Sequence, residues 1–482
     1  MLSIQKSMTK TFFALLSLPA TAMGFALSIQ ISALSWILST KYNLNIDDVG
    51  LVWASGPVAG ILGQVIVGII SDKVWLWKGR RRPFIFIGGF LAAMMLLALP
   101  NIDIISNSLG LGGILGVAIA VALTLDLAIN VSFNPTRSII ADVTKEGTDR
   151  TKGYAWMQTI SGTFGVLAYV IGAVWNNYVL IYFGIGLVLV LSIIPPFFIE
   201  EPKELEQQDE VKEKSSSKTS LIEILNNIQP LWGFLIYAVY AIAMRVFRIR
   251  FENYYAEIIC FVITLFFIMK VLLQNIEGKS KHNAGIIGFK KVLAAHSFTW
   301  IGVQTMFVYM FAYIQYKVYN FTPGSEISSD VQFEMGRIVS ISFLILNAVG
   351  AVLPAFILEP ITRKIGRVRT HAICISSMAF GYAGLLLFGF QPVVIYIFMA
   401  FLGIGWASTI SLPFAIMSQK VDQAKMGLFM GLFNLSVVLP QLVASFGVGQ
   451  AVNSSPDKSL IFIISAVSLA ISAVLWFFIK EE

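Results

Sequence analysis

The chain has 482 residues, of which 57% are hydrophobic and only 13% are charged. A soluble domain of this size needs far more charge to cover its surface, so the composition excludes a soluble protein. The formal net charge of +7 does not indicate a nucleic-acid partner, because the basic residues lie in short loops between apolar blocks. Cys260 and Cys374 are the only cysteines, and their apolar surroundings predict neither a disulfide framework nor a cysteine metal site.

Long apolar blocks follow one another through most of the chain. Blocks of about 20 residues cross roughly 30 Å of hydrocarbon as helices. In the first half they predict membrane spans at 11–38, 47–71, 84–101, 109–140, 153–175 and 178–199. In the second half they predict spans at 290–319, 332–358, 368–389, 391–417, 425–449 and 459–479. The sequence therefore predicts an all-α membrane protein.

The region between these halves contains a charged stretch and two additional apolar segments. The composition of 200–218 predicts a solvated linker. The segments 231–244 and 255–274 are separated by RVFRIRFENYYAE, which suits a membrane surface. They are either two extra crossings or two interfacial helices, since an odd number of crossings would invert the second half. We therefore predict three regions: an N-terminal six-helix bundle, a cytoplasmic linker with the two segments, and a C-terminal six-helix bundle, at 1–199, 200–285 and 286–482.

The basic residues predict the orientation of the spans. With the N-terminus in the cytoplasm, Lys and Arg cluster in the inner loops at 73–82, 145–152, 363–369 and 420–425. The outer loops carry few Lys or Arg, so the positive-inside rule is obeyed along the chain. Both termini are expected in the cytoplasm, and the first apolar stretch is expected to be a span rather than a removed signal peptide.

An internal repeat relates the two halves. An acid, six residues and a Gly-Arg pair follow the second and the eighth span, as Asp72 with Gly79-Arg80 and as Glu359 with Gly366-Arg367. Repeated halves that rock about a central site are the usual basis of alternating access.

Several motifs resemble those of the major facilitator transporters. The stretch GIISDKVWLWKGRRRPF resembles a variant of the family's loop motif, with three arginines before Pro-Phe. WASGPVAG in the second span and LDLAINVSFNPTRSIIADV in the fourth match further family patterns, as do SLPFAIMS and GLFNLSVVLPQ near the end. The three-arginine form resembles the plant sucrose transporters and their animal proton–sugar relatives. These are related to the glycoside–pentoside–hexuronide cation symporters, and the bacterial branch is the nearest match.

The resemblance implies a major facilitator fold of two six-helix bundles and a proton-coupled symport of a disaccharide. An α-glucoside such as maltose or sucrose is the first candidate, with H⁺ as the coupling ion and no cofactor. The second span lacks the carboxylates of melibiose-type sodium symporters, which argues against sodium coupling. The expected partners are a small sugar and membrane lipid, without nucleic acid. The expected state is a monomer in the bacterial inner membrane.

Asp126 is the predicted proton-coupling residue. It lies well inside an apolar helix, where an ionised carboxylate is costly and must be protonated, paired or exposed to a wet cavity. Burial favours its neutral form and so permits proton uptake and release. The resemblance assigns the matching Asp to proton coupling and sugar binding, whereas the alternative is a structural pair with an Arg at a helix end.

Amide side chains in the spans are predicted to bind sugar hydroxyl groups, which must replace their bonds to water. Asn130 lies one turn after Asp126 on the same helix face, and it either binds sugar or ties helices together. The other candidates are Gln30, Gln64, Gln158, Asn347 and Asn434.

Charged residues near the span ends are predicted to form inter-helix networks that hold one transport state and break in the other. The alternative is that the arginines only set the topology. The candidates are Asp72, Arg80, Arg81, Arg82, Arg137, Asp142, Arg337, Glu359 and Arg367. For Arg337, a pair with Glu334 is the alternative.

Other functions remain as alternatives. An exporter of sugars or drugs is the first, because fold does not decide direction. A sensor is disfavoured because the linker is too short for an output domain. An intramembrane enzyme is disfavoured because the spans contain no paired His and acid, Ser and His, or metal constellation. The three histidines, His282, His296 and His371, have no metal-binding spacing.

Overall fold

The computed structural model describes residues 3–60, 75–77, 79–110, 113–145, 148–202, 221–247, 249, 253–276, 278–421 and 426–480. Within these residues every regular element is a helix. Packing divides the chain into two compact units. Unit 1 comprises Met1–Ser215 and Pro323–Leu344, and unit 2 comprises Ser216–Thr322 and Ile345–Glu482.

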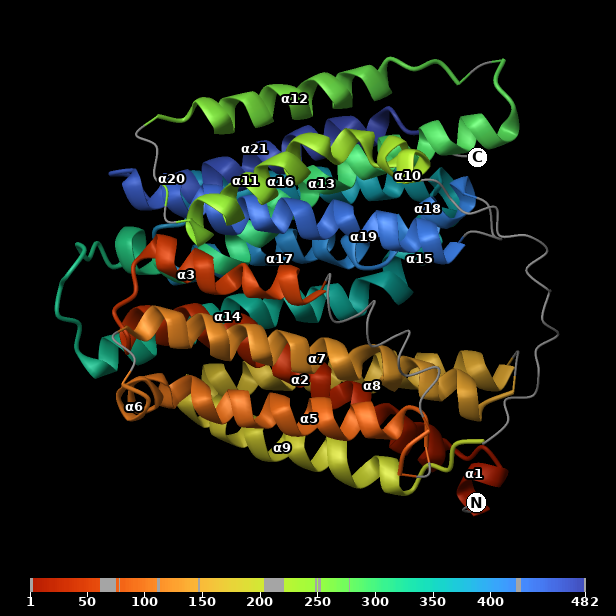
Figure 1. Ribbon diagram of the computed structural model, residues 1–482, viewed down its shortest axis with the longest axis vertical. Helices are drawn as coiled ribbons and strands as arrows, with labels where there is room; N and C mark the ends of the chain where they lie inside the picture. The colour runs from red at the N-terminus through yellow and green to blue at the C-terminus, as the bar shows by residue number, and fades with distance from the viewer. Residues whose placement is uncertain are drawn as a thin grey trace. The chain divides into compact units, whose positions relative to one another are not determined.

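Unit 1 is built around one long and mostly buried helix, α2. Its helices are α1 (Ser3–Lys6), α2 (Lys10–Thr40), α3 (Ile46–Trp53), α5 (Arg82–Ala98), α6 (Ile102–Ser108), α7 (Ile114–Val143), α8 (Thr148–Val174), α9 (Asn177–Phe197) and the first part of α14 (Ser329–Leu353). α2 packs against α8 and α9, while α5 packs against α7 and α9 (Figure 1). Small residues allow this close approach, since a Cβ on Gly89 of α5 would lie 2.1 Å from Ser192 Cβ of α9.

Unit 2 contains the remaining helices. They are α10 (Leu221–Asn227), α11 (Trp232–Val246), α12 (Tyr255–Leu272), α13 (Lys281–Tyr313), the end of α14, α15 (Glu359–Ile365), α16 (Arg367–Phe388), α17 (Pro392–Thr409), α18 (Leu412–Lys420), α19 (Met426–Val443), α20 (Gly449–Ser454) and α21 (Leu460–Phe477). α13 packs against α19 and α21, and α16 packs against α17 and α21. Short π-helical turns continue α13, α14 and α19 at Ile314–Val318, Pro354–Leu358 and Ala444–Val448.

Twelve helical stretches among the described residues are long and apolar enough to cross a membrane. Eleven of them correspond to predicted spans, and the twelfth is Tyr255–Leu272. The remaining predicted span, 47–71, is described only as far as residue 60. The prediction of an all-α, multi-pass membrane protein is therefore confirmed.

The two additional apolar segments form α11 and α12, which pack against each other on unit 2 (Figure 1). Only four side chains of α12 are buried: Cys260, Thr264, Ile268 and Val271. Its other faces expose Ile258, Phe261, Val262 and Phe266. An interfacial helix needs a polar face towards water, whereas α12 presents apolar residues outward. This pattern favours a crossing for α12, whereas α11, with 15 residues, is not among the twelve stretches of span length.

Candidate functional site

Asp126 lies on α7 in the interior of unit 1 and is 5% exposed. Gln30 Nε2 on α2 donates a hydrogen bond of 3.0 Å to Oδ1 of Asp126. Ser55 Oγ, in the helical residues that follow α3, donates a hydrogen bond of 2.8 Å to Oδ2. The two carboxylate oxygens therefore connect three helical segments, and we call Asp126, Gln30 and Ser55 the Asp126 cluster.

The Asp126 cluster contains neutral donors and no cation. Within the described residues no Lys or Arg forms an ion pair with Asp126. A buried carboxylate is costly without a cation, although hydrogen bonds to its charged form offset part of that cost. An acid in this setting can gain or lose a proton without breaking an ion pair.

Two further hydrogen bonds involve residues near this cluster along the chain. Asn130, half-buried, donates from Nδ2 to the backbone carbonyl of Asp126 at 2.8 Å. Trp53 Nε1 donates to Ser35 Oγ at 2.8 Å, which ties α3 to α2 close to Ser55 in sequence. Asn130 thus lies beside Asp126, as its spacing predicts, and its amide bonds to the backbone rather than to the carboxylate.

The other predicted sugar-binding amides are distributed over the two units. Gln158 is exposed on α8 of unit 1. Asn347 on α14 and Asn434 on α19 are half-buried in unit 2. Gln64 lies outside the described residues. Of the six predicted amides, the structure therefore brings Gln30 and Asn130 to Asp126.

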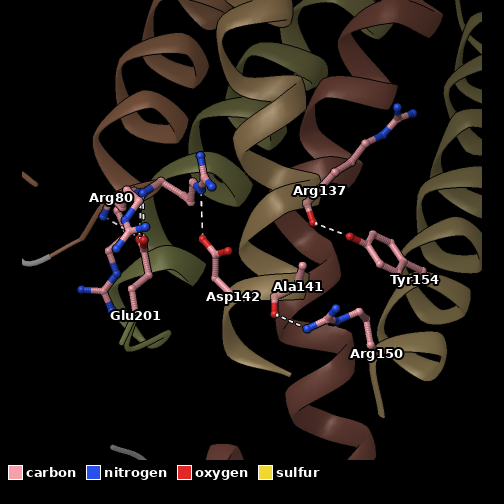
Figure 2. A network of polar contacts seen from close by, with 9 residues as sticks. Arg80, Arg137, Ala141, Asp142, Arg150, Tyr154 and Glu201 are labelled. Atoms are coloured by element: carbon pink, nitrogen blue, oxygen red, sulfur yellow. Dashed lines mark hydrogen bonds and ion pairs between the residues drawn. The ribbon is translucent and has the colours of Figure 1, made fainter. Parts of the chain in front are cut away.

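A second polar site lies at the end of unit 1 near the start of α5 (Figure 2). Arg81 Nε and Asp142 Oδ2 form an ion pair of 2.9 Å that links the start of α5 to the end of α7. Their side chains are only 9% and 11% exposed, so water screens the pair weakly. This contact joins two residues of the predicted charge network.

Glu201 completes this site, and sequence reasoning missed it. Its carboxylate accepts backbone N–H groups from Arg80, Arg81 and Arg82 at 2.8, 2.8 and 3.0 Å (Figure 2). These are orphan donors at the N-terminus of α5, where a negative charge also opposes the helix dipole. A Cβ on Gly79 would lie 2.5 Å from Glu201 Oε1, so the glycine of the Gly-Arg motif makes room for this cap.

Two further hydrogen bonds join α7 to α8 (Figure 2). Tyr154 donates from its hydroxyl to the Arg137 carbonyl at 3.2 Å, and Arg150 Nη2 donates to the Ala141 carbonyl at 3.3 Å. The Arg137 guanidinium lies over the Phe133 ring, one turn earlier, at 4.1 Å from the centroid. Within the described chain Arg137 forms no ion pair, because its side chain is turned to an aromatic neighbour on its own helix.

The repeat-equivalent charges in unit 2 are arranged differently. Glu359 Oε1 pairs with Arg363 Nη2 at 2.6 Å, one turn along α15, and not with Arg367. Gly366 ends α15 with φ of +90°, a conformation that side chains disfavour, and so separates Glu359 from α16. Arg337 and Glu334 are both exposed on α14 with no ion pair between them in the described structure. Asp72 lies outside the described residues.

A third polar cluster in unit 1 was not predicted. Ser32 on α2 and Ser340 on α14 lie 2.8 Å apart between their Oγ atoms, and Ser340 donates to Asn177 Oδ1 at 3.2 Å. Trp36 Nε1 donates to the Gln332 carbonyl at 2.8 Å. These contacts explain why the first part of α14 packs with unit 1. A single serine in an apolar helix gives no sequence signal of its hydrogen-bond partner. Ser55 differs, because it lies inside the WASGPVAG motif and could have been predicted as a site residue from that motif.

Comparison with known proteins adds three relationships in sequence. The chain matches the family model described as Major Facilitator Superfamily over residues 16–445. The sucrose transport protein SUC4 of Arabidopsis thaliana is 23% identical over 424 residues, covering 83% of this chain and 76% of that protein. The general alpha-glucoside permease of Schizosaccharomyces pombe is 29% identical over 174 residues, covering 32% of this chain and 31% of that protein.

Two solved structures resemble the whole chain. The POT family transporter PepTSo has a TM-score of 0.66 at 10% identity and 98% coverage of both chains. The nucleoside transporter NupG has a TM-score of 0.57 at 13% identity, covering 98% of this chain and 100% of that one. At such low identity the likeness concerns the fold alone.

Proposed function

The chain belongs to the major facilitator superfamily, and from this premise we propose that it is a proton-coupled symporter that imports a disaccharide by alternating access. The family and fold predicted from the sequence motifs are thereby confirmed, and the protein is a membrane transporter rather than an enzyme. An α-glucoside such as maltose or sucrose is the first candidate substrate. The names of the sucrose transport protein and the alpha-glucoside permease support this choice.

The observation that carries the proposal is the environment of Asp126. Its carboxylate is 5% exposed, and its partners Gln30 and Ser55 are neutral. Protonation of Asp126 would remove a buried charge without leaving an unpaired cation behind. Proton binding and release at Asp126 can therefore follow a change in its exposure to water, as alternating access requires.

In the proposed cycle, Asp126 binds a proton from outside and releases it inside. Gln30 and Asn130 provide amides beside it for sugar hydroxyl groups, and Gln64, Gln158, Asn347 and Asn434 remain proposed contributors. A proton that moves down ~150 mV gains about 3.5 kcal/mol, enough for roughly several hundred-fold accumulation of sugar. The Arg81–Asp142 pair stabilises one conformation of unit 1, and its loss accompanies the opposite one.

We also propose that the protein is a monomer in the cytoplasmic membrane of a bacterium, with both termini in the cytoplasm. The clusters of Lys and Arg in alternate loops support this orientation. A periplasm-active reporter fused after residue 482 should be silent, whereas a cytoplasmic fluorescent reporter at the same place should be bright. The opposite pattern would reverse the orientation.

The function is tested by uptake of radiolabelled maltose and sucrose in a bacterial host that lacks its own sugar transporters. We expect accumulation of at least one sugar, and we expect a protonophore to abolish it. Accumulation that survives the protonophore would contradict proton coupling. If neither sugar enters, efflux from preloaded inverted vesicles distinguishes the exporter alternative from a different glycoside substrate.

A further inference from the structure

An apolar groove lies on unit 1 between α5 and α9. Its volume is 580 Å³, and Phe86, Ile87, Phe90 and Leu91 line it from α5. Phe197 of α9 lines the opposite wall and is 66% exposed. From Arg82 to Leu91 the groove follows α5 for about 14 Å at 1.5 Å per residue. Such an outward-facing hydrocarbon surface meets lipid chains in a membrane.

A cation closes one end of this groove. Arg82 lines it and is only 8% exposed. Its Nε and Nη2 atoms are buried and have no hydrogen-bond partner in the described structure. Glu201 does not supply one, because its Oε1 accepts the backbone N–H of Arg82 rather than the guanidinium. Buried N–H groups of a charged side chain are costly when unpaired, so the geometry indicates an external acceptor.

Trp77 also lines the groove, and its backbone has a positive φ. Leu76 and Gly79 exchange two backbone hydrogen bonds of 3.0 Å, and Trp77 between them has φ of +49°. A bulky residue in this region of φ stores strain, and such strain concentrates at ligand clamps. The Trp77 ring lies 6.2 Å from that of Phe86, which lies 5.0 Å from that of Phe197.

The groove has the chemistry of an amphiphile site. Its walls are aliphatic and aromatic, which suits an acyl chain and not the hydroxyl groups of a sugar. The Arg82 guanidinium suits a phosphate, which it can bind through two parallel N–H groups. A glycerophospholipid places its phosphate at the membrane interface and its chains towards the centre. Along α5, Arg82 comes first and the apolar residues of the groove follow it, in the same order as the phosphate and chains of such a lipid.

We propose that this groove binds one anionic glycerophospholipid, with phosphatidylglycerol as the probe. One acyl chain lies between α5 and α9, beside Phe86 and Phe197. The phosphate accepts hydrogen bonds from the Arg82 guanidinium at the end of the groove. The anionic headgroup is favoured because the Arg82 guanidinium lines the groove without a hydrogen-bond partner, whereas Arg81 already pairs with Asp142, and basic pockets between spans bind such headgroups. The proposal of a lipid site does not depend on the proposed transport of sugar.

Native mass spectrometry of the purified full-length protein tests the site with phosphatidylglycerol and phosphatidylcholine at equal concentration. We expect one phosphatidylglycerol to stay bound under conditions that remove phosphatidylcholine. Arg82→Gln should lower that occupancy by about tenfold, because hydrogen bonds to charged groups are lost. The matched control Arg363→Gln removes an exposed cation of unit 2 and should leave the occupancy unchanged. Equal retention of both lipids by the wild type would overturn the proposal.

A second variant keeps the charge and fills the groove. Ile87, 45% exposed, tolerates a larger side chain, and Ile87→Trp should displace the acyl chain and lower phosphatidylglycerol occupancy as Arg82→Gln does. Unchanged occupancy in Ile87→Trp would overturn the placement of the chain. Displacement of phosphatidylglycerol by inorganic phosphate alone would identify a phosphate site instead and equally overturn it.

Fluorescence locates the lipid independently. Phosphatidylglycerol with brominated chains should quench part of the tryptophan emission, and that part should disappear in Trp77→Phe. Brominated phosphatidylcholine should not produce the same Trp77-dependent component. Quenching that is identical in the wild type and Trp77→Phe would place the bound lipid elsewhere.

Discussion

Two aspartates of the same helix have opposite electrostatic environments. Asp126 and Asp142 lie on α7, sixteen residues and therefore about 24 Å apart along its axis. Asp142 pairs with the nearly buried guanidinium of Arg81 at 2.9 Å, whereas Asp126 accepts hydrogen bonds from the neutral Gln30 and Ser55. A cation compensates the buried charge of Asp142, whereas only neutral donors compensate that of Asp126. The comparison separates a structural aspartate from the proposed proton carrier.

The largest effect is expected at Asp126. Asp126→Asn keeps the size of the side chain and removes its ability to take up and release a proton. We expect accumulation to fall from roughly several hundred-fold to no more than the outside concentration. Exchange of internal and external sugar, which needs no proton cycle, should persist. Glu334→Gln, which removes an exposed acid of α14, is the control and should retain protonophore-sensitive uptake. Full uphill uptake by Asp126→Asn would contradict the assignment of Asp126 as the proton carrier.

Removal of one partner of the Arg81–Asp142 pair should affect stability more than coupling. An uncompensated charge that is about nine-tenths buried costs about 3–5 kcal/mol. Thermal unfolding of the purified protein should therefore show a clearly lowered midpoint for Arg81→Gln and for Asp142→Asn. The charge swap Arg81→Asp with Asp142→Arg should recover part of the loss. Equal midpoints in the wild type and both single variants would show that the pair contributes nothing.

Removal of one neutral donor should weaken the proton site without abolishing it. Ser55→Ala leaves Asp126 with the hydrogen bond from Gln30, and we expect uptake at pH 7 to fall by about tenfold, the worth of one hydrogen bond to a charged group. Ser376→Ala is the matched control, because Ser376 bonds to the Ala372 carbonyl of its own helix. If uptake falls equally in both variants, the hydrogen bond from Ser55 to Asp126 has no specific role in transport.

A smaller loss is expected from the cap at α5. Glu201→Ala leaves the N–H groups of Arg80, Arg81 and Arg82 without their acceptor, and loss of a cap costs about 1 kcal/mol. Glu201→Gln keeps one oxygen as an acceptor, and its unfolding midpoint should lie between those of the alanine variant and the wild type. Glu334→Ala, an exposed acid on α14, serves as the control and should not change the midpoint. A midpoint for Glu201→Ala equal to that control would rule out the cap.

The smallest effect is expected for the repeat-equivalent acid of unit 2. Glu359 and Arg363 are 57% and 78% exposed, and a pair of this kind is worth about 0.5 kcal/mol or less. Glu359→Gln should therefore leave thermal unfolding nearly unchanged at moderate salt. A fall in the unfolding midpoint as large as that of Asp142→Asn would mean that Glu359 stabilises unit 2 as strongly as Asp142 stabilises unit 1.

The amino-acid sequence by itself determined the class of fold. Apolar blocks of span length force helices, because every backbone polar group in hydrocarbon must be paired within its own segment. The position of Asp126 inside such a block already identified it as costly and therefore as a functional candidate. The consecutive arginines and the acid of α7 were likewise visible as the parts of a charge network.

The tertiary structure decided which of these parts meet. Gln30 and Ser55 are 96 and 71 residues from Asp126 in the chain, and helical periodicity gives no information about contacts between helices so far apart. Glu201 belongs by composition to a charged linker, yet it caps α5. Ser340 belongs by chain order to the second half, yet its hydroxyl bonds to α2 and α9 of unit 1. Partner choice depends on the packing of helices against one another, because a buried polar group is stable only where another chain segment supplies its hydrogen bond.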